Sequence, residues 1–202
     1  MKDSKTNESV ELKSQLMISM RFILVLFLVA LFASCEDEVT IKPKAQLSLE
    51  YSKPEYEDVK IGFPFQFQKN KIARLDKKRS FGLNLQYPNM KATVYMTYQK
   101  VTETNLDSLL RDAQKLAYDH AVKAESIPNH PFVNPDDNVY GMFYMINGNA
   151  ATQAEFYLTD SIQNFITGAL YFEAKPNFDS IYPAVIYLRK DMRRIMETLR
   201  WK

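Results

Sequence analysis

The chain has 202 residues, of which 46% are hydrophobic, 13% aromatic and 25% charged. This length suits one domain of ordinary size, and the composition is ample for a packed core. The first 35 residues hold four bases and three acids, and removing them from the totals of 26 and 24 leaves 22 bases and 21 acids. Such a near-neutral body gives no electrostatic basis for binding nucleic acid.

An uninterrupted apolar run covers residues 22–32. It follows Arg21 and ends at the small residues Ala33 and Ser34, directly before Cys35, the only cysteine. A membrane-spanning helix needs about 18 or more apolar residues, so this run is too short to cross a bilayer. The pattern is instead typical of a bacterial lipoprotein signal, in which a cysteine thiol receives a diacylglycerol. We therefore predict lipidation at Cys35 rather than a buried free thiol.

The signal divides the chain into three parts. Residues 1–35 hold a polar extension and the signal peptide, and translation from Met17 or Met20 instead of Met1 would shorten the extension. Residues 36–45 are acidic and then contain lysine and proline, which suits an extended tether. Acids directly after a lipidated cysteine also resemble a bacterial signal for display on the cell surface, and a solvated linker is the alternative. Residues 46–202 are predicted to form a single α+β domain.

The first part of this domain is predicted to contain strands and then a helix. Alternation of apolar and polar residues predicts half-buried strands over residues 47–51, 63–67, 81–87 and 91–98, the last two joined as a hairpin. Apolar residues at helical spacing then predict an amphipathic helix to about Ser126, preceded by a capping pattern at Thr104 and Asp107. Pro128, Pro131 and Pro135 then predict a break in the regular structure, and the polar residues 134–138 predict a loop.

The second part is predicted to form a meander and a final helix. Apolar runs over residues 139–146, 150–158 and 165–172 predict three antiparallel strands, with Asn147-Gly148-Asn149 as a hairpin turn. Apolar residues spaced four and three apart from Ile181 to Leu199 predict a helix with Ser180 as N-cap and Pro183 in its first turn. The predicted fold is an antiparallel β-sheet of about six to seven strands with two main amphipathic helices packed on it.

Residues that could carry catalysis or hold a metal are scarce. Besides Cys35 only His120 and His130 could ligate zinc by sulfur or nitrogen, which is too few for the usual site. No phosphate-binding loop or nucleophile elbow occurs. Acidic pairs such as Glu155 with Asp160 are ordinary in any folded domain and do not by themselves indicate an acid and base. The sequence therefore predicts no catalytic residue, no metal site and no cofactor.

Two surface features suggest binding. The final helix carries bases that we place on the side away from its apolar stripe, where they could dock an acidic partner or anionic lipid: Arg189, Arg193, Arg194 and Arg200. A solvated helix whose cations complement the helix dipole is the simpler interpretation. The strand over residues 139–146 is apolar on both faces, so we expect it to be central and covered on both sides, in part by a partner protein.

Several runs resemble the gliding-motility lipoprotein family GldD of Bacteroidetes. The resemblance covers about Leu47 to Lys202, and its most specific part is the ending Glu197-Thr-Leu-Arg-Trp-Lys. The other similar runs are residues 105–116, 131–135, 139–144 and 148–151. The resemblance implies a non-enzymatic envelope lipoprotein, required for gliding and associated with the type IX secretion apparatus. It supplies no catalytic or cofactor residues.

The expected function is therefore that of an accessory or scaffolding lipoprotein. Its partners would be other gliding and secretion proteins of the envelope, and the lipid on Cys35 would anchor it to a membrane, which we expect to be the outer membrane. The alternative is a lipid-tethered protein whose aromatic sheet face binds a glycan or another small ligand. A large aromatic-lined pocket would favour that alternative, and a shallow apolar patch beside the cationic helix would favour the scaffold.

Overall fold

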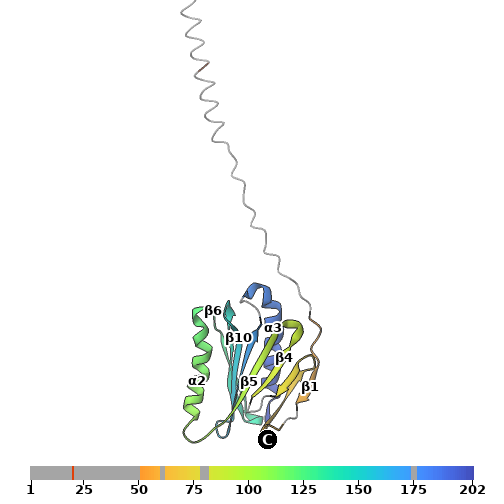
Figure 1. Ribbon diagram of the computed structural model, residues 1–202. Helices are drawn as coiled ribbons and strands as arrows, with labels where there is room; N and C mark the ends of the chain where they lie inside the picture. The colour runs from red at the N-terminus through yellow and green to blue at the C-terminus, as the bar shows by residue number, and fades with distance from the viewer. Residues whose placement is uncertain (1–19, 21–50, 60–61, 78–81, 174–176) are drawn as a thin grey trace, which may run out of the picture. The chain divides into compact units, whose positions relative to one another are not determined.

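Alternating apolar strands build the centre of the protein. The computed structural model describes residue 20 and residues 51–59, 62–77, 82–173 and 177–202. Seven of the described strands form one sheet in which all neighbours are antiparallel (Figure 1). Their order is β3 (Arg74–Lys77), β4 (Gly82–Tyr87), β5 (Ala92–Lys100), β11 (Asn164–Phe172), β10 (Thr152–Thr159), β8 (Val139–Met145) and β7 (Asn129–Asn134). The predicted α+β class and antiparallel sheet are confirmed.

One face of this sheet is covered by the last helix and a small second sheet. Helix α3 (Phe178–Thr198) buries Leu188, Met192 and Ile195 against sheet residues such as Phe156 and Leu158. The second sheet has the order β1 (Tyr56–Val59), β2 (Phe65–Asn70) and β12 (Arg200–Trp201). Its phenylalanines join the same apolar core as the stripe of α3. This face therefore holds the main core of the protein.

The opposite face is covered only in part, by helix α2 (Leu106–Asp119). Successive side chains of a strand point to opposite faces, so Phe165 turns away from the core that contains Ile166. Phe165 packs with Leu109 of α2, and Tyr157 lies against the same cluster. The two helices therefore lie on opposite faces of the sheet, with the strands between them (Figure 1).

Several predicted strands and connections are confirmed. Strands β4 and β5 form the expected hairpin, joined by a 3-10 turn, η1 (Pro88–Met90), that ends in left-handed Lys91. Strands β8, β10 and β11 are neighbours, as the predicted meander requires. The predicted strand over residues 47–51 lies outside the described residues except for Tyr51, which belongs to no element. No helix among the described residues is long and apolar enough to span a bilayer.

The predicted end of the first helix is wrong. Helix α2 stops at Asp119, and after the turn η2 (His120–Val122) the chain becomes strand β6 (Ala124–Ser126). This strand pairs with β9 (Asn147–Gly148), where Gly148 has a φ of 101° and its missing side chain makes room for Glu125. Long-range pairing with a glycine turn therefore overrides the helical spacing of the alanines.

The predicted loop over residues 134–138 contains the short turn η3 (Pro135–Asp137), but the break predicted around Pro131 is wrong. Residues 129–134 form β7, an edge strand paired only with β8 among the described strands. Pro131 fits there because an edge strand has one row of backbone groups that needs no partner. Strand β8 is therefore next to the edge and not central, although both its faces are covered as expected. Its cover comes from this chain's own α2 and α3.

The last helix begins earlier than predicted. Its N-cap is Asn177 rather than Ser180, and the amides of Ser180 and Ile181 both donate to the Asn177 carbonyl. Pro183 consequently lies inside the helix and not in its first turn. The apolar stripe that predicted the helix is confirmed as core.

Candidate functional site

The predicted lipidation site, Cys35, lies outside the described residues. The four arginines proposed for partner binding are all described, and the structure places them in different surroundings. They are therefore considered one at a time.

Arg189 is buried, against the expectation that it faces away from the apolar stripe. It is 7% exposed, and its guanidinium donates to the backbone oxygens of Gln153 (2.9 Å) and Ile146 (2.9 Å) and to the side chain of Asn147 (3.0 Å). Burial lowers the pKa of Arg189 to about 10, which still leaves it charged at neutral pH. Its guanidinium supplies hydrogen-bond donors to two backbone carbonyls, one just after the end of β8 and one at the start of β10. Arg189 therefore fixes α3 on the sheet.

Asp191, an acid of the same helix, is buried as well. It is 1% exposed and accepts hydrogen bonds from the Tyr56 hydroxyl and the Asn70 amide, both at 2.9 Å. Burial raises the pKa of Asp191, and the hydrogen bonds from Asn70 and Tyr56 oppose this. The carboxylate thus ties α3 to the small sheet.

The exposed bases of α3 are Lys190 and Arg193, three residues apart on one helical face. The Arg193 guanidinium lies over the Phe143 ring, 5.4 Å from its centroid. Arg194 is half-buried, because it stacks on Tyr56 and donates to the Gln68 side chain at 2.6 Å. We call Lys190 and Arg193 the basic ridge of α3.

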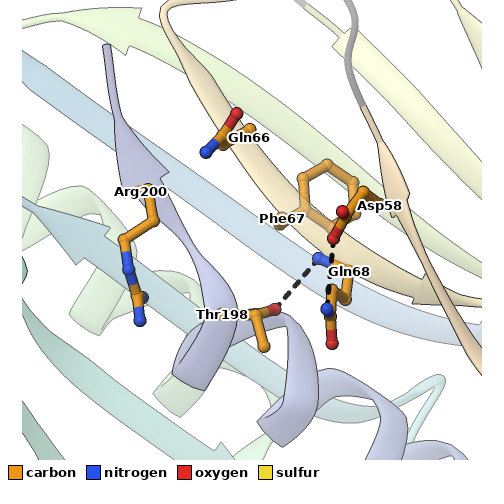
Figure 2. Close-up of a pocket in the computed structure, with 6 residues that line it drawn as sticks. All are labelled: Asp58, Gln66, Phe67, Gln68, Thr198 and Arg200. Carbon is orange, nitrogen blue, oxygen red and sulfur yellow. Dashed lines mark hydrogen bonds between the residues drawn. The ribbon is translucent and has the colours of Figure 1, made fainter.

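Arg200 lies beside a hollow of about 320 Å³ between the end of α3 and the small sheet (Figure 2). Its guanidinium pairs with Asp137 at 2.6 Å and donates to the Leu199 carbonyl at 2.7 Å. On the other side of the hollow the backbone and side chain of Gln68 donate to Thr198 and Asp58, as Figure 2 shows. These polar groups therefore join α3 to strand β2 and already have partners within the chain.

A second hollow lies on the other face of the sheet, beneath α2. It has a volume of about 210 Å³, and Ala113 and Leu116 of α2 form one wall. The sheet forms its floor and adjoins a more open hollow of about 400 Å³, with Tyr95 and Tyr171 belonging to both. We call the two hollows together the tyrosine groove. Its four tyrosines are Tyr95, Tyr144, Tyr157 and Tyr171.

Strand register explains the position of the tyrosine groove. Across the sheet Tyr144 pairs with Glu155, Glu155 with Ala169, and Ala169 with Tyr95, so these residues form one row on the same face. Side chains paired in this way have Cβ atoms about 5 Å apart. Ala169 is the smallest member of the row, so it leaves space between Glu155 and Tyr95.

Glu155 is the acidic group in the enclosed part of the groove. It is 4% exposed, and burial raises its pKa to about 7, with a further contribution from the nearby carboxylate of Asp119. Asp160 is not its partner, because it lies five residues further along the strand, about 16 Å away at ordinary strand rise. Asp160 instead accepts the amides of Ile162 and Asn164, and its pKa is lowered.

Sequence reasoning missed the tyrosine groove as a unit. Its residues come from four strands and α2, so only the pairing register brings them together. A signal was present, because Glu155 is the only charged residue in the run over residues 150–158. No group of three or more His, Cys, Asp or Glu that could hold a metal occurs in the part of the chain that the structure describes.

Comparison with protein-family models gives a clear relationship. Residues 36–201 match the family model described as gliding motility lipoprotein GldD. No curated protein matches the chain. The family match covers all of the described sheet strands and both helices. The chain therefore belongs to the GldD family of gliding-motility lipoproteins, whose members are lipid-anchored proteins of the cell envelope.

Proposed function

We propose that this protein is a non-enzymatic accessory lipoprotein of the gliding and type IX secretion machinery, held at the outer membrane, which works through contacts with other envelope proteins. The observation that carries the proposal is the family match over residues 36–201, since it covers the folded domain and not one short motif. The export signal that ends at Cys35 supports the anchor, because two or three acyl chains give stable membrane attachment.

The basic ridge is the surface on α3 that we propose for these contacts. Lys190 and Arg193 are exposed, whereas Arg189 is withdrawn into the sheet. Two cations three residues apart on one helical face can meet the same acidic surface. Reversing both charges replaces attraction with repulsion, and like charges opposed at an interface cost several kcal/mol, on the order of 2 to 5 kcal/mol.

The experiment compares two charge reversals in cells whose only copy is the variant. The test variant carries Lys190→Glu and Arg193→Glu, and the matched control carries Arg111→Glu and Lys115→Glu on exposed positions of α2. We expect the first to impair gliding and secretion at normal protein abundance and the second to leave both intact. Normal motility with the first variant would show that the basic ridge is not a contact surface. Normal gliding in cells that lack the protein would contradict the proposed function itself.

A second candidate function is the binding of a glycan or another small ligand in the tyrosine groove. The observation that favours it is the tyrosine lining, because aromatic rings stack on the apolar faces of such ligands. The enclosed hollow is about 210 Å³, below the range of about 300 to 1,000 Å³ that is usual for small-molecule pockets. This size favours a smaller occupant.

A further inference from the structure

We propose that the tyrosine groove binds one basic side chain, a lysine or arginine, from an extended segment of a partner protein. The inference rests on the proposed function, in which the protein works through contacts with other envelope proteins. It assigns the groove, and not only the basic ridge, to partner binding.

The lining of the groove matches a cation in its chemistry. The faces of tyrosine rings attract cations through their electron-rich centres, and such contacts strengthen where water is excluded. Tyr95 and Tyr171 lie edge to face with centroids 5.7 Å apart, and Tyr144 is held in the same way by Tyr118 of α2, at 6.0 Å. The rings are therefore fixed before any ligand arrives.

The charges of the groove select the same kind of ligand. The charged residues that line its two hollows are both acidic, Glu155 in the enclosed part and Glu173 in the open part. The chain after residue 35 is almost neutral as a whole, with 22 bases and 21 acids, so the acidic lining is a local property of the groove. A cation entering the groove would meet a carboxylate with little competition from water, because Glu155 is 4% exposed.

The shape of the groove suits a side chain with its flanking backbone. The enclosed hollow lies between Leu116 and the small residue Ala169, and it opens into the wider hollow past Tyr95, which is 45% exposed. A side chain would enter the enclosed part while the segment that carries it lies in the open part. Helix α2 covers this face of the sheet only in part, and Tyr95 is 45% exposed, so a segment can approach the open hollow from solvent.

The experiment measures binding of short peptides to the full chain in detergent micelles by NMR. The probe is acetyl-Ala-Lys-Ala-amide, and its matched control replaces lysine with norleucine, which keeps the length but lacks the ammonium group. We expect the lysine peptide to shift the signals of Thr167 and Ala169 at millimolar concentration, and the norleucine peptide to bind at least about fivefold more weakly. A glycan, cellobiose, is titrated in parallel.

Three variants test the site, and a fourth is the control. Glu155→Gln should weaken binding of the lysine peptide about tenfold, since a hydrogen bond to a charged group contributes about 1.5 kcal/mol or more. Ala169→Leu should block the enclosed hollow, and Tyr95→Leu should weaken binding a few fold, by about two to five times. Tyr182→Leu is the matched control, because Tyr182 is 42% exposed on α3 and lies far from the groove lining.

The pH dependence gives an independent readout. The ionisable groups around Glu155 are Asp119 of α2, Tyr157 two residues further along β10, and the other tyrosines of the groove: Tyr144, Tyr95 and Tyr171. With the pKa of Glu155 raised to about 7, its ionised fraction grows between pH 6 and pH 8, while lysine stays charged. Binding should therefore tighten over this interval in the wild type and not in Glu155→Gln.

The outcomes separate the alternatives. Equal binding of the norleucine peptide would overturn the proposal in favour of a purely apolar groove, and binding of cellobiose without lysine would overturn it in favour of a glycan site. No binding of the lysine peptide at 10 mM, about the weak limit for one charged contact, would also overturn it. Each of these results leaves the gliding experiment unaffected, so failure of the groove and failure of the proposed function are distinguishable.

Discussion

Glu155 gives the protein an unusual stability profile at the scale of one residue. Burial raises its pKa from an ordinary acidic value to about 7, so the folded state holds the proton more tightly than the unfolded chain does. For an acid with a raised pKa this contribution to stability is full at low pH and is lost as the pH rises from about 4.5 to about 7. Over that interval the free energy of unfolding should fall by up to about 3 kcal/mol.

Urea unfolding at several pH values between 4.5 and 8 tests this expectation. Asp191 also has a raised pKa from burial, so its contribution falls with rising pH in the same direction. The Glu155→Gln variant removes only the Glu155 part, and its profile should be flatter than that of the wild type. Parallel profiles for the two proteins would show that Glu155 ionises normally in the fold.

Substitution of buried Arg189 and of its exposed neighbour Lys190 should have very different effects on the stability of the fold. Arg189→Glu would place a carboxylate against the carbonyls of Gln153 and Ile146, and we expect it to lower the free energy of unfolding by about 3 to 5 kcal/mol. Lys190→Glu should change it by no more than about 0.5 kcal/mol, as is usual at an exposed position. Chemical denaturation of both variants measures the difference, and equal stabilities would contradict the structural role of Arg189.

The sequence could not separate Arg189 from the other arginines of the helix. It follows directly after Leu188 of the stripe, and at 100° per residue a neighbour of the stripe lies on its flank. Whether that flank meets water or another element depends on where β8 and β10 end, which is a matter of tertiary structure. Helical spacing therefore identified the buried stripe correctly and placed one flanking cation wrongly.

At the scale of elements, the apolar stripe of α3 is the feature on which the fold depends. Leu188 is 0% exposed in the main core, so Leu188→Asp would bury an unpaired charge and should unfold the domain. Leu116→Asp on α2 is the matched control, because Leu116 is 43% exposed at the rim of the groove. Circular dichroism and thermal melts should show a folded control and an unfolded Leu188→Asp. A normal melt for Leu188→Asp would mean that the stripe is not core.

Helices and strands could be predicted from the sequence where the spacing of the apolar residues on their buried face is regular. The alternating strands β4 and β5 and the stripe of α3 follow this rule. It failed for β6 and β12, which are short and pair with strands far along the chain. It also failed for β7, which carries a proline and pairs with the following strand β8. The tyrosine groove was missed for the same reason, since its row of side chains exists only once four strands are in register.

At the scale of the whole molecule, the lipid on Cys35 is expected to determine where the domain resides. Cys35→Ser lacks the thiol that accepts diacylglycerol, so the variant should incorporate no labelled fatty acid and should move to the soluble envelope fraction. The domain itself should remain folded, because the change lies outside the described domain. Fatty acid incorporation into the variant would contradict lipidation at this cysteine.

The position of β12 has a consequence for the order in which the chain can fold. Its Trp201 pairs with Phe65 of β2, and the Lys202 amide donates to the Pro64 carbonyl at 2.9 Å. A polypeptide is synthesised from its N-terminus, so β2 emerges long before the strand and the helix that complete its surroundings. Contacts between such distant segments slow folding and leave apolar surface exposed in the interim. We therefore expect the phenylalanines of β2 to be most prone to aggregation before residues 200–202 are available to pair with them.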